Sequence, residues 1–222
     1  MNDTKKYEWL VAHRHPIFLV GLIIFFILPE LFEKIFHFSI PFPILITILI
    51  LSSILLIHVS RRKRYFPFGL VGMLIAFIFI WNNYRESVDL GRVAYILLFI
   101  YFSFITFYLF QDLLRSRNVT VSVIIGAFAG YFMIGVMYFF IYASLDNAYP
   151  DTISVDLKTT AGIEDMFYFS FVTLTTIGYG DFSPTSTLGQ KVAILEGLTG
   201  QFYLAIIMAI LVGKFLSMNP ED

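Results

Sequence analysis

The chain contains no cysteine and few charged residues. Of its 222 residues 14% are charged, against about 25% in a typical soluble domain. Without cysteine it has no disulfides, no thiolate metal sites and no thiol nucleophile. Its net charge of −1 leaves none of the basic surplus that binding to a phosphate backbone requires, which excludes nucleic acid as a partner.

The chain is instead rich in apolar residues. Hydrophobic residues make up 58% of it, 26 Phe and 13 Tyr among them, and its mean hydropathy is +0.80. This composition leaves too little polar surface for a protein dissolved in water. We therefore predict a membrane protein that lies in a lipid bilayer.

Apolar segments that approach the length of a membrane span recur along the chain. A helix needs about 20 mainly apolar residues to cross the hydrocarbon core. The sequence predicts six such helices, at about 16–32, 38–59, 65–81, 93–111, 119–141 and 188–216. We expect an all-α membrane protein.

The basic residues indicate the direction of these spans. If the N-terminus is inside, most Lys and Arg residues fall on the inner side, where the run at 61–64 carries much of the bias. Most acidic residues fall on the outer side, where they would concentrate cations or simply solvate the loops. We predict a multi-pass protein of the cell membrane with cytoplasmic N- and C-termini.

The segment between the last two spans has a different pattern. Residues 164–174 read as a short apolar helix with Glu164 and Asp165 in its first turn, followed by Thr-Thr-Ile-Gly-Tyr-Gly-Asp at 175–181. Gly178 and Gly180 alternate with larger residues, and glycine accepts positive φ. Conformations of alternating hand turn successive carbonyls to one side. Such a carbonyl ladder in a membrane could line a path for a dehydrated cation, but one chain supplies only one wall.

This segment resembles the selectivity filter of tetrameric potassium channels, and the stretch 193–204 is similar to the inner helix of small bacterial potassium channels. The resemblance covers about residues 119–216 and implies a homotetrameric pore that conducts K⁺ passively. It divides the chain into a cytoplasmic N-terminus (1–15), a four-helix peripheral membrane domain (16–118), a pore domain (119–216) and a cytoplasmic tail (217–222). Within the pore domain we expect an outer helix at 119–143, a re-entrant pore helix at 164–174, a filter at 175–181 and an inner helix at 188–216.

The resemblance also implies roles for single residues. The ion-binding residues would be Thr176, Ile177, Gly178, Tyr179 and Gly180, with K⁺ held by the carbonyls of 176–179 and the Thr176 hydroxyl. Thr175, Asp181 and Tyr168 would support the filter. Some members pair the aspartate with a glutamate and a tryptophan of the pore helix, but Val172 and Tyr168 stand at those positions here. We predict that the Tyr168 hydroxyl binds Asp181; the alternative is that Tyr168 only packs.

Two features of the last span carry further predictions. Gly200, Leu204, Met208 and Val212 recur at helical spacing, and by resemblance this stripe forms the gate, with Gly200 either as a hinge or as a site of close helix contact. Glu196 is an acid inside a span, where charge is costly. We favour a structural role, protonated or bonded to pore-helix hydroxyls such as Ser170 or Thr173, over direct ion binding.

The fourth predicted span contains no Lys or Arg between Arg92 and Arg115. A voltage sensor needs several charges that move through the field, so we expect no conventional voltage gating. The spans also lack a Ser/His, paired-acid or His/Asp arrangement, so we expect no enzyme and no cofactor, with K⁺ as the permeant ion. The alternatives are a weakly selective cation channel and a regulatory subunit that does not conduct alone.

Overall fold

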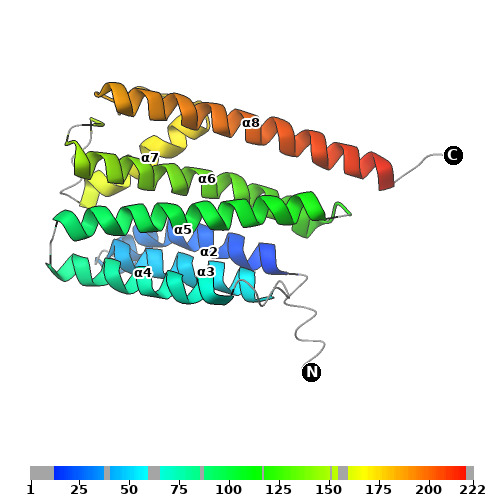
Figure 1. Ribbon diagram of the computed structural model, residues 1–222, viewed down its shortest axis with the longest axis horizontal. Coiled ribbons are helices and arrows are strands. Elements are labelled where there is room, and N and C mark those ends of the chain that lie inside the picture. Colours follow the sequence, from blue (N-terminus) through cyan, green and yellow to red (C-terminus); the bar gives the residue numbers. More distant parts are fainter. Residues whose placement is uncertain are drawn as a thin grey trace. The chain divides into compact units, whose positions relative to one another are not determined.

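The computed structural model describes residues 13–37, 41–59, 66–85, 88–116, 118–150, 152–154 and 160–218. Over this part of the chain the regular secondary structure is helical (Figure 1), and an isolated antiparallel bridge joins Ile153 to Pro184. The helices are, in chain order, α2 (Arg14–Phe36), α3 (Phe42–Val59), α4 (Phe66–Arg85), α5 (Val88–Arg115), α6 (Val121–Ala148), α7 (Thr160–Leu174) and α8 (Thr187–Met218). The all-α class predicted from the sequence is therefore confirmed for these residues.

Local sequence explains where several helices begin. Pro16, Pro43 and Pro67 lie in the first turns of α2, α3 and α4, where a missing N–H breaks no helical hydrogen bond. The Ser186 hydroxyl accepts a hydrogen bond from the Gly189 N–H at 3.0 Å and caps the start of α8. In α5 an acid in the first turn and Arg115 in the last complement the helix dipole.

Three of the described helices are long and apolar enough to cross a membrane: Asp89–Arg115 in α5, Val121–Ala148 in α6 and Thr187–Ser217 in α8. Shorter apolar helices occur at Arg14–Pro29, Phe42–Ile57 and Pro67–Asn82. Helical structure over the described residues, with these three long apolar helices, fits a membrane protein. The predicted tails at 1–15 and 217–222 lie largely outside the described residues, and the basic run at 61–64 lies entirely outside them.

The short helix α7 begins earlier than the sequence predicted. It starts at Thr160 instead of residue 164, so Glu164 and Asp165 lie beyond its first turn. Gly162 and Met166 are both buried and stand one turn apart, so the buried face of the helix continues toward its start. The predicted placement of the two acids in the first turn was therefore wrong.

The chain divides into two compact units, each described here by itself. Unit 1 comprises residues 1–86 and 120–129. Its helices α2, α3 and α4 pack with α3 against both of the others, around a core that includes Phe18, Leu22 and Leu49. Buried His15 of α2 lies with its Nδ1 2.9 Å from the Ser122 carbonyl oxygen at the start of α6.

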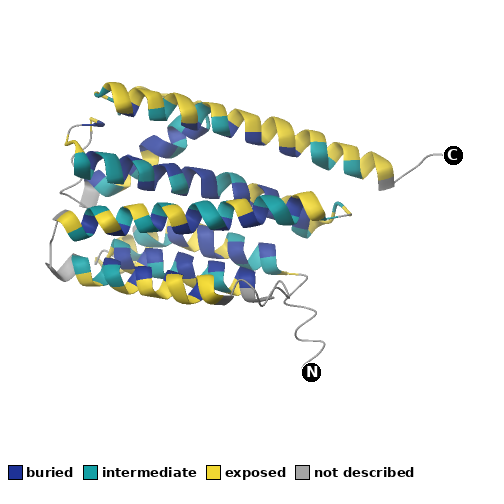
Figure 2. Ribbon diagram, in the orientation of Figure 1, coloured by how far each residue is buried: buried dark blue, intermediate teal, exposed yellow. Residues whose placement is uncertain are grey.

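Unit 2 comprises residues 87–119 and 130–222 and contains the segment singled out in the sequence. Its core is aromatic: the rings of Phe102 and Phe140 stack with centroids 5.4 Å apart, and Tyr142 is fully buried. Figure 2 shows α6 mostly buried and α8 mostly exposed. A single copy thus leaves much of the apolar surface of α8 uncovered.

Candidate functional site

The segment at 175–181 leaves the end of α7 through hydrogen bonds that return to the helix. The amides of Thr175, Thr176 and Ile177 donate to the carbonyl oxygens of Phe171, Thr173 and Val172, each at 3.0 Å. These bonds satisfy carbonyls that a helix end otherwise leaves without partners. The start of the segment is thereby attached to α7, so the position of the helix determines the position of the segment.

The backbone of this segment alternates in hand. Gly178 and Gly180 have φ of 57° and 82°, as the glycine spacing predicted. Thr176 also has positive φ, at 59°, which the sequence reasoning missed because a β-branched residue rarely adopts it. Counting back in steps of two from the glycines would have pointed to this threonine.

The carbonyl groups of Thr176, Ile177, Gly178 and Tyr179 accept no hydrogen bond from the described part of the chain. The side chains beside them are also uncovered: Ile177 is 54% exposed and Tyr179 71% exposed. Unpaired carbonyl oxygens in a row are suitable ligands for a cation without its water shell.

Tyr168 and Asp181 meet as the sequence predicted. The Tyr168 hydroxyl donates to Asp181 Oδ2 at 2.8 Å, and Asp181 Oδ1 accepts the Phe182 amide at 3.1 Å. The hydrogen bond to Asp181 raises the pKa of the Tyr168 hydroxyl, so Tyr168 keeps its proton and remains the donor. This pair connects the middle of α7 to the far end of the segment.

We expect Tyr168→Phe to destabilise the far end of the segment, because the variant keeps the ring but removes the donor to Asp181. If the chain conducts K⁺ as the resemblance of its sequence implies, the current recorded from reconstituted protein should decline faster during sustained flux. Tyr149→Phe is the control, because Tyr149 is exposed and lies in the loop after α6. Unchanged conduction and an unchanged time course in Tyr168→Phe would show that Tyr168 only packs.

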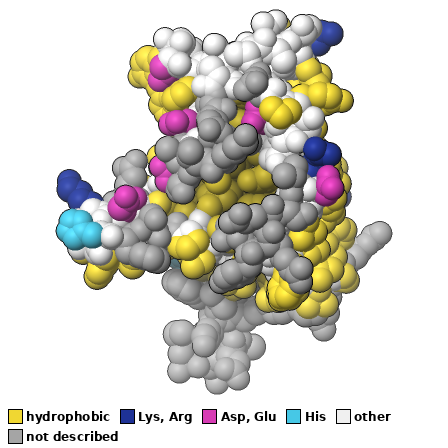
Figure 3. Space-filling view, turned by 90° about the vertical axis from the view of Figure 1, so that its left-hand side faces the viewer, with side chains coloured by type: hydrophobic (Ala, Val, Ile, Leu, Met, Phe, Trp, Pro, Cys, Tyr) yellow, Lys and Arg dark blue, Asp and Glu magenta, His cyan; other side chains and the backbone are white. Residues whose placement is uncertain are grey.

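The loop after α6 holds the chain that follows Asp181. Ser154 and Thr185 donate backbone N–H bonds to the carbonyls of Ser183 and Thr152, both at 3.0 Å, on either side of the Ile153–Pro184 bridge. No sequence pattern pointed to this pairing, because it joins two irregular segments. Figure 3 faces the end where α5 and α8 begin and shows acidic side chains there. Among the acids of unit 2, Asp89, Glu164 and Asp181 are exposed.

Glu196 of α8 lies fully buried behind α7. Its Oε1 lies 2.6 Å from the Ser170 hydroxyl oxygen, and its Oε2 accepts the Tyr142 hydroxyl at 2.6 Å. The contact with Ser170 is the one the sequence predicted. The other pore-helix hydroxyl considered there, Thr173, does not appear among these contacts.

Gly200 lies where α8 touches the end of α7. A methyl group there would fall 2.7 Å from the Leu174 carbonyl oxygen and 2.8 Å from Leu174 Cδ1. Close helix contact is thus a sufficient reason for glycine at this position. The other predicted gate residues, Leu204, Met208 and Val212, lie exposed along α8 in the single chain.

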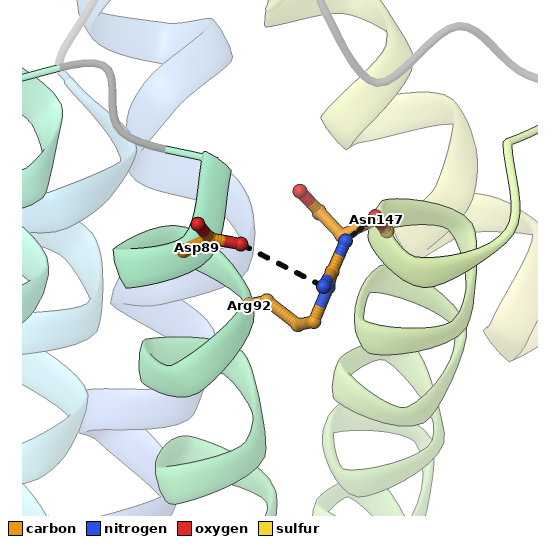
Figure 4. A network of polar contacts seen from close by, with 3 residues as sticks. All are labelled: Asp89, Arg92 and Asn147. Atoms are coloured by element: carbon orange, nitrogen blue, oxygen red, sulfur yellow. Dashed lines mark hydrogen bonds and ion pairs between the residues drawn. The ribbon is translucent and has the colours of Figure 1, made fainter.

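Charged side chains of unit 2 bind at the helix ends. Arg92 Nη2 donates to the Asn147 carbonyl oxygen at 2.9 Å, and its Nη1 lies 3.7 Å from Asp89 Oδ1 (Figure 4). At the other end of α5, the Lys214 ammonium of α8 donates to the carbonyls of Leu113 and Leu114 at 2.9 Å and of Ser116 at 2.6 Å. Arg92 therefore links the start of α5 to the end of α6, and Lys214 links α8 to the end of α5.

Comparison with known proteins finds similarity over the part of the chain that contains this site. A family model described as "Ion channel" matches residues 119–217. Potassium voltage-gated channel subfamily A member 10 of Gallus gallus is 28% identical over 86 residues, which cover 37% of this chain and 17% of the relative. The proteins of that name from Mus musculus and Homo sapiens are 36% identical over 55 residues, covering 25% of this chain and 11% of each relative.

The chain thus spans less than a fifth of the length of these relatives. No solved structure matches it significantly. The matched residues contain α6, α7, the segment at 175–181 and α8, which together hold every candidate site residue. Residues 119–217 are thus similar to an ion-channel family, and the matches to potassium channels support a place for this region in the potassium channel superfamily.

Proposed function

We propose that the protein is a K⁺-selective channel in which the carbonyls of 176–179 and the Thr176 hydroxyl replace the water shell of the ion. The alternating φ values of Thr176, Gly178 and Gly180 carry this proposal, because they accompany consecutive carbonyls that accept no hydrogen bond from the residues that the structure describes. The relatives are named as potassium channels, which supports the choice of ion. Flux is passive.

Four copies around an axis complete the pore in this proposal. One copy supplies one wall of carbonyls, and closed cyclic symmetry supplies the others. Neighbouring copies and lipid would contact the surfaces that a single copy leaves uncovered. These are the exposed side chains of Ile177 and Tyr179 and the apolar surface of α8. In this assembly α7 is the pore helix, α6 the outer helix and α8 the inner helix.

The remaining helices complete six spans per chain, with both termini in the cytoplasm and the acid-rich end outside. The relatives are named as voltage-gated, but we propose that this protein has no conventional voltage sensor. The helix α5 has no Lys or Arg between Arg92 and Arg115, and those two side chains mark the ends of its apolar stretch. We expect a shallow dependence of conductance on voltage.

Ion flux into liposomes tests this function. The purified protein should set a reversal potential that follows the K⁺ gradient against Na⁺, and Ba²⁺ should block the current. A reversal potential that ignores the K⁺ gradient would indicate a weakly selective cation channel. Absence of flux from well-folded protein would indicate a subunit that does not conduct alone, and a steep conductance–voltage curve would contradict the gating proposal.

A further inference from the structure

Four groups from three helices of unit 2 form a buried polar cluster around Glu196, defined here as Glu196, Ser170, Tyr142 and the Gly135 carbonyl. Glu196 belongs to α8, Ser170 to α7, and Tyr142 and Gly135 to α6. The Ser170 hydroxyl oxygen lies 2.6 Å from Glu196 Oε1 and 2.9 Å from the Gly135 carbonyl oxygen. Both Glu196 and Ser170 are 0% exposed.

A count of hydrogens decides which form of Glu196 fits this cluster. A serine hydroxyl carries one hydrogen, and a carbonyl oxygen carries none. If Ser170 donates its hydrogen to Gly135, the short contact with Glu196 Oε1 needs a hydrogen from the glutamate. The Tyr142 hydroxyl supplies the hydrogen for Oε2. A neutral acid therefore satisfies all three contacts, whereas a carboxylate leaves one of the Ser170 contacts without a hydrogen.

Among the described residues, the surroundings of the cluster offer no cation that pairs with Glu196. Within the described ranges no Lys, Arg or His side chain forms an ion pair with Glu196. The titratable groups that interact with it are Tyr131, Tyr138 and Tyr142 of α6, and the groups of α7 and α8 nearby are the neutral hydroxyls of Ser170 and Thr199. An unpaired charge buried in this way is strongly disfavoured.

We propose that Glu196 stays protonated and acts as a positioning residue that holds α7 through Ser170. Ser170 stands one turn before Leu174, where α7 ends. The amides of Ile177 and Gly178 bind the Val172 carbonyl at 3.0 and 3.3 Å, so a shift of α7 carries the carbonyl row with it. The effect on conduction rests on the proposed channel function, but the protonation does not.

Infrared spectroscopy tests the protonation directly. We expect a carbonyl stretch of a protonated carboxylic acid in wild-type protein with isotope-labelled glutamate in liposomes, which Glu196→Gln lacks, at neutral pH. A difference spectrum that shows carboxylate bands alone would overturn the proposal. This readout does not depend on ion flux, so a wild-type protein that shows the band without conducting would contradict the channel function alone.

Variants of the cluster test the positioning role. Glutamine keeps an amide donor for Ser170 and an oxygen for Tyr142, so Glu196→Gln should keep the K⁺/Na⁺ permeability ratio within about twofold of wild type. Glu196→Leu leaves two buried hydroxyls without that partner and should lower the ratio at least about tenfold. Equal loss in both variants would overturn the proposal.

Two more variants separate positioning from folding. Ser170→Ala cuts the link to α7 but keeps the bond between Tyr142 and Glu196, so it should lower the permeability ratio even if Glu196→Leu does not fold. Thr199→Val is the matched control, because it removes a bond between α6 and α8, from Tyr138 at 2.9 Å, that does not involve α7. An unchanged ratio in Ser170→Ala, or an equal loss in Thr199→Val, would overturn the role of Ser170.

Discussion

Gly200→Ala is expected to abolish selective K⁺ flux, whereas Gly197→Ala, one turn earlier on α8, leaves it near wild type. The added methyl group at Gly200 would lie 2.7 Å from the Leu174 carbonyl oxygen, and that residue is fully buried. A backbone atom cannot move aside as a flexible side chain can. Overpacking of this kind costs about 1–3 kcal/mol. Because Leu174 ends α7, the displacement passes directly to the segment at 175–181.

Gly197→Ala is a close match for this change. Its methyl group would meet the Thr173 carbonyl oxygen at 4.0 Å, which is ordinary contact. Permeability ratio and thermal stability should be measured for both variants in the same lipid. If Gly200→Ala kept wild-type selectivity and stability but stayed closed, Gly200 would act as a hinge and not as a contact site.

Gly178→Ala is expected to lower the K⁺/Na⁺ permeability ratio by at least about tenfold, because φ > 0 costs an L-residue about 1–2 kcal/mol. The cause is backbone conformation and not space: a methyl group at Gly178 meets nothing within 4 Å in the single chain, while its φ is 57°. Relaxation toward negative φ would turn a carbonyl out of the row. In a pore made of four copies the change occurs in every wall.

Gly213→Ala is the control for Gly178→Ala. Its methyl group also meets nothing within 4 Å, but Gly213 lies in α8, where alanine is favoured. Bi-ionic reversal potentials should therefore change in one variant only. Equal behaviour of the two would mean that the hand of the backbone at Gly178 is not needed for selectivity.

The sequence predicted best those contacts that follow from short spacings or from the chemistry of one conspicuous residue. The spacing of Gly178 and Gly180 indicated positive φ at both residues. Tyr168 was a suitable donor for Asp181, and a buried acid at Glu196 favoured hydroxyl partners. The residue types alone restricted these choices. The six-span count, the tetramer and the roles of single filter residues remain predictions.

What the sequence did not predict depends on packing between distant segments. The positive φ of Thr176 is rare for a β-branched residue, and it accompanies a hydrogen bond from the Thr176 amide to the Thr173 carbonyl at the end of α7. The pairing of 152–154 with 183–185 joins two loops that have no regular pattern. The earlier start of α7 reflects burial of Gly162, which only a folded chain reveals.

The Lys214 contact has a mechanical consequence. One ammonium group of α8 donates to three carbonyls at and just after the end of α5, those of Leu113, Leu114 and Ser116, so the two helix ends cannot separate without leaving that group unsolvated or drawing water to it. A bend of α8 must therefore either break these hydrogen bonds or move the end of α5 with it. Coupling between two sites is reciprocal. A movement of α5 therefore changes the free energy of bending α8 by the same amount as a bend of α8 changes the free energy of moving α5.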